Sequence, residues 1–307
     1  MKTSLDHLPE RKQHEVQTIA TLLRDEFEQF VQRKTSSTKA DYRILKIILF
    51  GSHAKGTWVN DPIHGYVSDY DILVLVNSPE LVEEYGLWSH AEDRIQRRIQ
   101  APFSLLVHTL SEVNDWLHQG HYFFKDIREQ GVELYRYSNN PLAQPGNLSA
   151  QEQKAIAEKH FGQWFFRAEQ FFISFRDDLD RKWYAKAAFE LHQAAERFLA
   201  CTLLVCTNYL PRTHNLKHLR AFCTQQDRRF FELFPNTSRF TRRSFQRLKR
   251  AYVDARYSEH YEITTEELEW LASEVERLRQ LTEEVCQARI TALTEQARQE
   301  ELSSREG

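Results

Sequence analysis

Two aspartates one residue apart, Asp69 and Asp71, stand at the start of the apolar run "DILVLV". Side chains at positions i and i+2 of a strand point to the same face, so these two carboxylates should lie together. Burying two like charges side by side is costly unless a cation compensates them. Mg²⁺ or Mn²⁺ favours carboxylates together with phosphate oxygens, so the pair predicts a metal site that also takes a phosphate.

A second pair of residues, Gly51 and Ser52 in "ILFGSHAKG", stands where the preceding apolar run ends and a helix should begin. A helix N-terminus offers free N–H groups and a partial positive charge, which suits a triphosphate. Gly51 permits a close approach of the backbone, and Ser52 can donate its hydroxyl. A phosphate holder that faces a metal holder predicts metal-assisted phosphoryl or nucleotidyl transfer.

The two motifs "GSHAKG" and "SDYDILV" together resemble the G-S-x-A-x-G…S-D-x-D signature of the polymerase-beta-like nucleotidyltransferase superfamily, specifically its minimal nucleotidyltransferases. The resemblance implies that Gly51, Ser52 and Ser68 bind the nucleotide and that Asp69 and Asp71 bind Mg²⁺. It also implies transfer of NMP, with AMP from ATP the first choice among the NTPs. The acceptor would be a hydroxyl on a protein, an RNA or a small molecule.

The resemblance covers about residues 15–137 and has one departure in length. The segment "TWVNDPIHGYV" between Gly56 and Ser68 is longer than expected for the minimal members. We interpret it as a lid or a loop that reads the acceptor.

A second departure concerns the third carboxylate, which active members carry on a later strand to activate the attacking hydroxyl. The strand here is "APFSLLVHTL", and the matching position is Ser104, which cannot act as ligand and base in the same way. His108, Glu112 or Asp115 could substitute, although a packed histidine is the preferred interpretation of His108. If none does, the domain would be a non-catalytic nucleotide sensor.

The C-terminal half resembles a HEPN domain over about residues 150–290. The resemblance rests on "AAFELHQAAERFLACTLL" (187–204), "THNLKHL" (213–219) and "YVDARYSEHY" (252–261). It implies a toxin–antitoxin-like pairing of two domains and a homodimer formed through the helical domain.

Many HEPN domains are RNases that use an Arg and a His with four to six residues between them. Here Arg256 and His260 have only "YSE" between them, a spacing of i, i+4 that places both on one helix face. The alternative interpretation is a packing network of Arg256 with Tyr252, Asp254 and Tyr257. The competing function is therefore an RNase or RNA-binding module restrained by a nucleotide-binding domain, with Tyr257 as one candidate acceptor.

The composition is that of an ordinary globular protein, with 41% hydrophobic and 28% charged residues and a formal net charge of −3. One local basic run, "RFTRRSFQRLKR" (239–250), is a candidate nucleic-acid patch or the solvated face of a helix. The four cysteines form no C-x-x-C pair, which favours buried thiols in a reducing compartment. No apolar run approaches the roughly 20 residues that span a bilayer, and we expect a cytoplasmic protein without a membrane partner.

The elements that position the motifs are strands and helices in the first half of the chain. We expect an amphipathic helix with helical spacing of apolar residues from Val16 to Phe30, and an α+β fold with a mixed sheet and flanking helices. The expected strands are 42–50, 71–76, 101–110 and 132–137, and the expected helices between them are 80–100 and 111–130.

The second half has few glycines and should be helical, as an all-α bundle of four to five helices. Ser149 and Glu152 have the spacing of a capping box at the first of these helices. The predicted domains are 1–137, nucleotidyltransferase-like, and 151–307, HEPN-like, with a linker at 138–150. The last ~20 residues are polar, and we expect them to fray.

Overall fold

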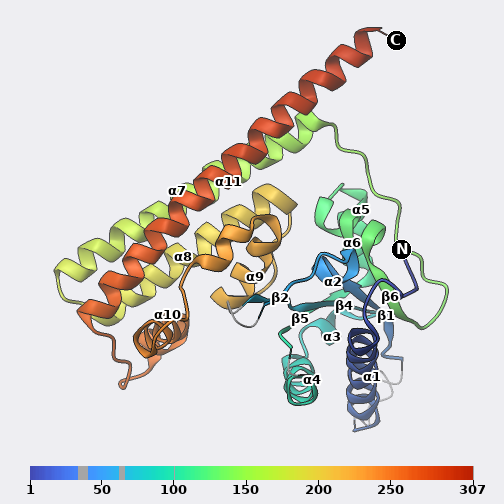
Figure 1. The fold of residues 1–307 in the computed structure, drawn as a ribbon, viewed down its shortest axis with the longest axis horizontal. Coiled ribbons are helices and arrows are strands. Elements are labelled where there is room, and N and C mark those ends of the chain that lie inside the picture. The colour runs from blue at the N-terminus through green and yellow to red at the C-terminus, as the bar shows by residue number, and fades with distance from the viewer. Residues whose placement is uncertain (34–40, 62–65, 100, 307) are drawn as a thin grey trace. The chain divides into compact units, whose positions relative to one another are not determined.

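The computed structural model describes residues 1–33, 41–61, 66–99 and 101–306. The chain divides into two compact units, Met1–Asn147 and Leu148–Gly307. Figure 1 labels the elements of both units.

The N-terminal unit is built on a mixed four-stranded sheet in the order β5-β4-β1-β6. Strand β4 pairs parallel with β5 and antiparallel with β1, and β1 pairs antiparallel with β6. A separate two-stranded ladder joins β2 to β3. The strands are β1 (Ile44–Phe50), β2 (Asn60–Asp61), β3 (Tyr66–Val67), β4 (Tyr70–Val76), β5 (Phe103–Thr109) and β6 (Val132–Arg136). The mixed sheet confirms the predicted fold class of this half.

Helices cover the sheet on both sides, and Figure 1 shows α1 and α4 on one face and α5 and α6 on the other. Strand β4 is buried along its whole length because both faces are covered, which explains its uninterrupted apolar sequence. The apolar stripe of α1 packs on one face, where Ile19 and Leu23 join Ile72 and Val74 in one core. The covering helices are α1 (Glu10–Arg33), α4 (Tyr85–Arg98), α5 (Leu110–His118) and α6 (Tyr122–Gln130).

Two expected helices are each divided in the structure. The region 80–100 forms a short α3 (Pro79–Val82) and then α4, and the indole N–H of Trp88 donates to the carbonyl of Leu81 between them. The region 111–130 forms α5 and α6, which meet at Gly120 with φ of 75°. A left-handed residue ends a helix, so continuous helical spacing in the sequence does not give one continuous helix here.

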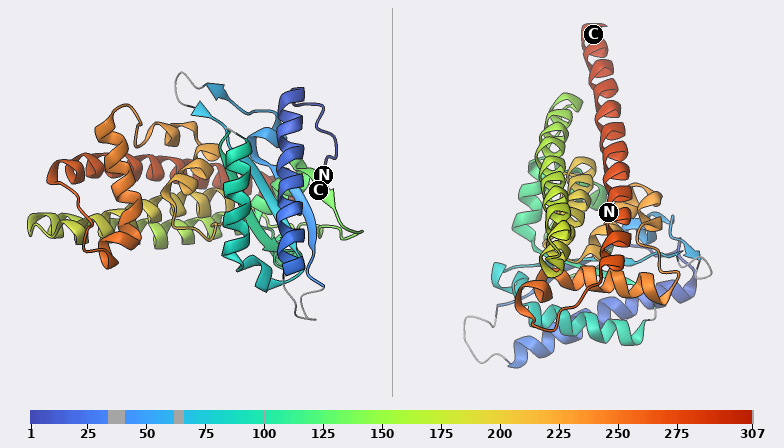
Figure 2. Two further views of the ribbon diagram at one scale, coloured as in Figure 1. Left: turned by 90° about the horizontal axis from the view of Figure 1, so that it is seen from below. Right: turned by 90° about the vertical axis from the view of Figure 1, so that its left-hand side faces the viewer.

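In the described residues of the C-terminal unit, all regular secondary structure is helical, which confirms the predicted all-α class. Helix α8 is buried along most of its length and packs against α7, α9, α10 and α11. Its alanines, among them Ala187, Ala194 and Ala195, let neighbouring helices approach closely. Figure 2 shows α10 running across the direction of α7 and α11. The elements are α7 (Ala150–Asp180), α8 (Tyr184–Thr207), α9 (Leu216–Gln226), the 3₁₀ helix η2 (Arg228–Glu232), α10 (Arg239–Tyr257) and α11 (Thr265–Glu306).

The structure agrees with the prediction from sequence at the start of this unit but differs from it at the end. The capping box at α7 is confirmed, because the Ser149 hydroxyl accepts from the Glu152 N–H and the Glu152 carboxylate accepts from the Ser149 N–H. The expectation of a fraying C-terminal tail is wrong. Helix α11 continues to Glu306, with Leu293 and Ala297 buried, and the Glu300 carboxylate accepts from the Ala150 N–H.

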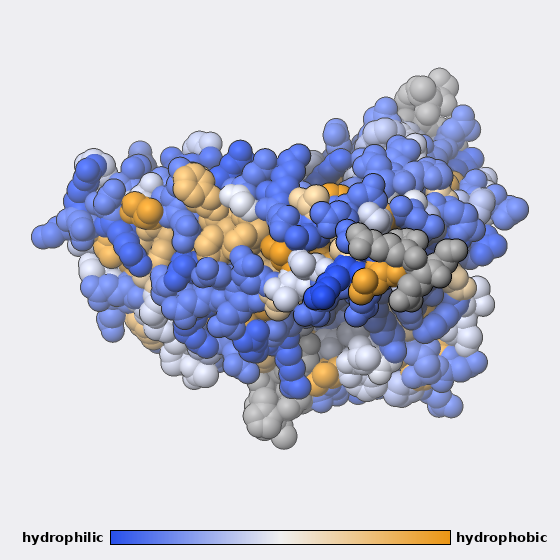
Figure 3. Space-filling view, turned by 90° about the horizontal axis from the view of Figure 1, so that it is seen from above, coloured by the Kyte–Doolittle hydropathy of each residue, from blue (hydrophilic) through white to orange (hydrophobic). Residues whose placement is uncertain are grey.

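The molecular surface in Figure 3 is largely hydrophilic, with hydrophobic residues in small patches. Phe166 and Ile173 of α7 are among the large apolar side chains that the described residues expose, at 59% each. Within the described part of the chain, no helix has the length and apolar character needed to cross a membrane.

Candidate functional site

The first candidate site lies where β1 ends and β4 begins, because antiparallel pairing places Phe50 opposite Asp71. Gly51 follows with φ of 70°, and a Cβ built on it would lie 2.2 Å from Asp71 Oδ2. The Asp71 carboxylate therefore lies directly over the Gly51 backbone. Only glycine permits both the left-handed conformation and this close approach. The structure thus brings together the two halves of the predicted site.

Helix α2 (Gly51–Lys55) starts at the predicted residue but has a single turn. It ends at Gly56, whose φ of 79° lets its N–H donate back to the Ser52 carbonyl. Because the macrodipole of five residues is small, phosphate binding here would rely on local N–H groups and on the Ser52 hydroxyl.

Asp69 precedes β4 by one residue, and Ser68 lies just before it. Ser68 is buried, and its hydroxyl accepts from the Val59 N–H at 2.9 Å while its own N–H donates to the Val59 carbonyl. Ser68 thus ties the segment after α2 to the start of β4. The predicted lid falls partly outside the described residues, since only the β2–β3 ladder on either side of residues 62–65 is described.

A buried histidine, His53, connects the Gly51-Ser52 turn to the strand that carries the aspartates. Its Nδ1 lies 2.9 Å from the Asp69 carbonyl oxygen. A carbonyl only accepts, so Nδ1 carries the proton, and Nε2 accepts from the Lys12 ammonium at 3.3 Å. The imidazole also stacks on Trp58 and packs against Tyr70. This fixed ring sets the position of α2 relative to Asp69.

Burial, with a smaller contribution from a nearby charge, keeps the His53 ring neutral. Burial and, second, the nearby Lys12 ammonium lower the pKa of His53 to about 4. Burial also lowers the pKa of Lys12, although Glu15 opposes this. The Tyr70 hydroxyl donates to Glu15 at 2.6 Å, and burial together with this bond raises the pKa of Tyr70. Helix α1 therefore supplies the polar partners that hold the back of the site.

Ser104 lies at the position where a third carboxylate was expected. It is buried and pairs in register with Asp71 on the neighbouring strand. His108 lies four residues further along β5, which is about 13 Å. It packs edge-on against Trp116 and is almost fully buried, in agreement with a packed histidine. Glu112 completes the capping box of Thr109. Neither His108 nor Glu112 thus lies beside Asp71 to replace the third acid.

The donors at this edge suit a hard divalent cation. They are the carboxylate oxygens of Asp69 and Asp71, the kind of ligand that Mg²⁺ and Mn²⁺ prefer to thiols. Among the described residues, no cluster of three or more His, Cys, Asp or Glu side chains is arranged to hold a metal ion. Two carboxylates do not make such a cluster, so Asp69 and Asp71 would hold Mg²⁺ or Mn²⁺ only together with further oxygens from water or a bound phosphate.

The HEPN-like candidate pair does not have the expected geometry. Helix α10 ends at Tyr257, so His260 lies in the turn beyond it and shares no helix face with Arg256. The expected i, i+4 arrangement is wrong, because Ser258 is extended and ends the helix. Arg256 instead donates to the Tyr252 carbonyl at 2.7 Å and lies over the Tyr252 and Tyr257 rings. A role of Arg256 and His260 in RNA cleavage stays a prediction.

Sequence reasoning missed a polar chain in the helical unit. The Tyr252 hydroxyl lies 3.2 Å from His214 Nε2, and His214 Nδ1 lies 3.1 Å from the Glu196 carboxylate. His192, fully buried, lies 3.4 Å from the same carboxylate. The signal was available in "ELHQAAERFL" and "THNLKHL", but the contacts join three segments far apart in the sequence. His214 and His218 are four residues apart in the sequence, but they do not lie on one helix because α9 begins at Leu216, after His214.

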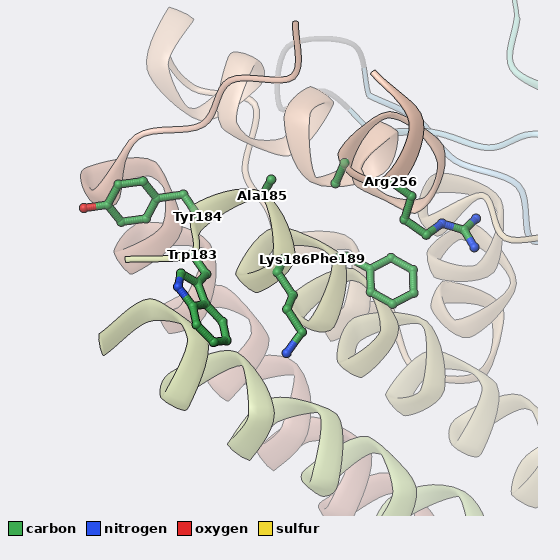
Figure 4. Close-up of a pocket in the computed structure, with 7 residues that line it drawn as sticks. Trp183, Tyr184, Ala185, Lys186, Phe189 and Arg256 are labelled. Carbon is green, nitrogen blue, oxygen red and sulfur yellow. The ribbon is translucent and has the colours of Figure 1, made fainter. Parts of the chain in front are cut away.

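A shallow hollow of about 420 Å³ lies beside Arg256, at the start of α8 and the end of α10. Trp183, Lys186 and Phe189 contribute to its walls. Figure 4 shows Tyr184 and Arg256 pointing in opposite directions, so its side chains do not converge on one ligand position. Its lining includes none of the residues of the site at Asp71.

Comparison with known families finds a match in each of the two units. A family model described as a nucleotidyltransferase domain matches residues 24–101, which include Gly51, Ser52, Asp69 and Asp71. A model described as a HEPN domain matches residues 161–285. A search among curated proteins finds no match.

Proposed function

Because the chain joins a nucleotidyltransferase domain to a C-terminal HEPN domain, we propose that it transfers NMP from an NTP, with ATP the first choice, to an acceptor hydroxyl. Asp69 and Asp71 hold Mg²⁺ or Mn²⁺, and Gly51 and Ser52 bind the triphosphate. The observation that carries the proposal is the packing of the Asp71 carboxylate over Gly51, which joins the phosphate turn and the metal strand.

Each residue of the proposed site has a defined role in transfer. The Ser52 hydroxyl and the N–H groups of the α2 turn orient the triphosphate, and the absence of a Cβ at Gly51 leaves room for the Asp71 carboxylate beside that turn. The Lys12–His53 pair fixes the Asp69 backbone, so that the Asp69 carboxylate is presented at a set distance from the turn. When bound, the cation neutralises charge on the phosphates and polarises the phosphoryl group.

The proposal is tested with the full-length protein, each α-labelled NTP and a cell extract, followed by identification of the labelled product. The variant is Asp69→Asn with Asp71→Asn, which keeps the shape of both side chains but removes both charges. The matched control is Asp25→Asn with Asp93→Asn, which removes two charges from helices α1 and α4 on the covering face. We expect transfer to be abolished in the first variant and kept in the control.

Unchanged labelling in the Asp69/Asp71 variant would contradict the role of these two aspartates as metal ligands. Binding of ATP by the wild type without release of pyrophosphate, in the presence of extract, would contradict transfer and support the sensor hypothesis that Ser104 raises. A metal titration gives a second readout, since Mn²⁺ should raise the thermal midpoint of the wild type but not that of the variant.

A further inference from the structure

The first residues of the chain, 1–8, form a segment that is fixed on the sheet of the N-terminal unit. Lys2 bridges Val132 of β6 in parallel, through backbone hydrogen bonds of 3.0 and 2.9 Å to the residues on either side of it. Figure 1 shows this start of the chain beside β6. Leu5 and Leu8 are buried in the core that α1 and β4 share. Backbone hydrogen bonds and apolar burial therefore hold this N-terminal segment in place.

Two side chains of the N-terminal segment reach α2, the single-turn helix of the candidate site. The Lys2 ammonium donates to the Ala54 carbonyl at 3.3 Å. The His7 Nε2 lies 2.9 Å from the His53 carbonyl oxygen, and because a carbonyl only accepts, this nitrogen carries the proton. The two contacts join parts of the chain that are 52 and 46 residues apart in the sequence.

These contacts supply hydrogen bonds that α2 cannot make within itself. The last carbonyls of a helix have no N–H partner inside that helix. In α2 the Ser52 carbonyl accepts from the N–H groups of Gly56 and Thr57. The next two carbonyls, those of His53 and Ala54, accept from the N-terminal segment. The position of α2 thus depends on donors that lie outside its own motif.

His53 connects the N-terminal segment to the strand that carries the aspartates. Its carbonyl accepts from His7, while its ring donates to the Asp69 carbonyl at 2.9 Å. The same short helix begins with Gly51, over which the Asp71 carboxylate packs. A shift of α2 would therefore change the distance between the two halves of the site. A site that loses its supporting contacts can stay folded and still lose the geometry that its ligand needs.

We propose that Lys2 and His7 are positioning residues of the proposed transfer site, which hold the Gly51-Ser52 turn where it binds the triphosphate. Neither side chain touches the nucleotide, and both act through the carbonyls of α2. The inference rests on the proposed function and adds a support for its phosphate site from outside the two sequence motifs. Both side chains are exposed, so water competes for each hydrogen bond, and the test removes the two donors together.

The first measurement is amide hydrogen exchange in the ligand-free, full-length protein, with any affinity tag placed at the C-terminus. The variant Lys2→Met/His7→Leu removes both donors and keeps apolar side chains of similar length. The matched control Lys125→Met/His14→Leu makes the same replacements at exposed positions of α6 and α1. We expect the amides of α2 to exchange about 10-fold faster in the variant and at the wild-type rate in the control.

The second measurement is calorimetric titration with ATP and with inorganic tripolyphosphate, each with Mn²⁺, well below the unfolding temperature of every variant. We expect the dissociation constants of both ligands to rise about 10-fold in Lys2→Met/His7→Leu, because the turn binds the phosphates that they share. The control should stay within about twofold of the wild type. The variant Lys2→Arg/His7→Gln keeps an N–H donor at both positions and should recover most of the lost affinity.

The outcomes separate the positioning role from the proposed function. Binding of both ligands by the wild type, with unchanged dissociation constants in Lys2→Met/His7→Leu, would overturn the positioning role and leave the proposed function standing. A lower unfolding temperature without a change in exchange at α2 or in affinity would show a structural role only, and would also overturn it. A loss of affinity for ATP but not for tripolyphosphate would contradict an action through the phosphate turn. If the wild type binds neither ligand, the proposed function fails and the positioning role fails with it.

Discussion

At the scale of single residues, the site depends on a position that carries no side chain. We expect Gly51→Ala to destabilise the protein by about 1–3 kcal/mol, because alanine is strained at a positive φ and its Cβ would overlap the Asp71 carboxylate. Transfer should fall by about 100-fold, since the carboxylate must move by an appreciable fraction of an ångström. Denaturant unfolding and the transfer assay measure the two effects.

Gly86 provides the control for this substitution. It lies in α4 with no atom within 4 Å of a built Cβ, so Gly86→Ala should leave transfer unchanged and raise stability by up to about 1 kcal/mol. A Gly51→Ala protein with normal stability and normal transfer would show that the Asp71 carboxylate is free to move.

The neutral His53 ring gives the metal-free protein a specific pH dependence. Its pKa is lowered to about 4 in the folded state, so between pH 6.5 and 4 the unfolded chain binds a proton that the folded chain does not. The stabilisation is complete above pH 6.5, and about 3 kcal/mol is lost as the pH falls to 4.

The variant His53→Asn tests this assignment, because an asparagine amide can still donate to the Asp69 carbonyl but does not titrate. We expect denaturation in EDTA at several pH values to show a shallower loss of stability for the variant than for the wild type between pH 6.5 and 4. Parallel curves for the two proteins would place the titrating group elsewhere.

At the scale of elements, periodicity predicted the long helices and the buried strands but not their interruptions. Spacing from Val16 to Phe30 gave α1, and the apolar run "DILVLV" gave β4. The division at Gly120 depends on a positive φ that glycine permits but does not require. The extension of α11 depends on Leu293 and Ala297 being buried, a tertiary contact that its polar sequence hides.

The same limit applies to the site. The spacing of "GSHAKG" and "SDYD" was enough to predict which residues meet, because the pairing of β1 with β4 follows from two adjacent apolar strands. The role of His53 was not predictable, since its partner Lys12 is 41 residues away in the sequence. Arg256 and His260 do not share the predicted helix face because α10 ends at Tyr257. The sequence has no strong signal for a helix end at that residue.

The capping box of α7 can be tested as an element. We expect Ser149→Ala to lower the stability of the helical unit by about 1 kcal/mol, because the Glu152 N–H loses its acceptor. Ser149→Asp restores a side-chain acceptor and should recover most of that loss. Denaturant unfolding measures both variants, and equal stability of Ser149→Ala and the wild type would show that the start of α7 contributes nothing to the folded unit.

At the scale of the whole molecule, the proposed transfer site and the HEPN-like candidate pair Arg256 and His260 lie in different compact units, Met1–Asn147 and Leu148–Gly307, each with its own buried core. Binding energies at sites in separately folded units add without coupling unless a conformational equilibrium links them. We therefore expect Asp69→Asn with Asp71→Asn to bind labelled RNA within about twofold of the wild type.

Calorimetry with ATP and Mn²⁺ in the presence and absence of RNA measures this coupling directly. A change in the ATP affinity caused by RNA would show that a conformational equilibrium links the two units.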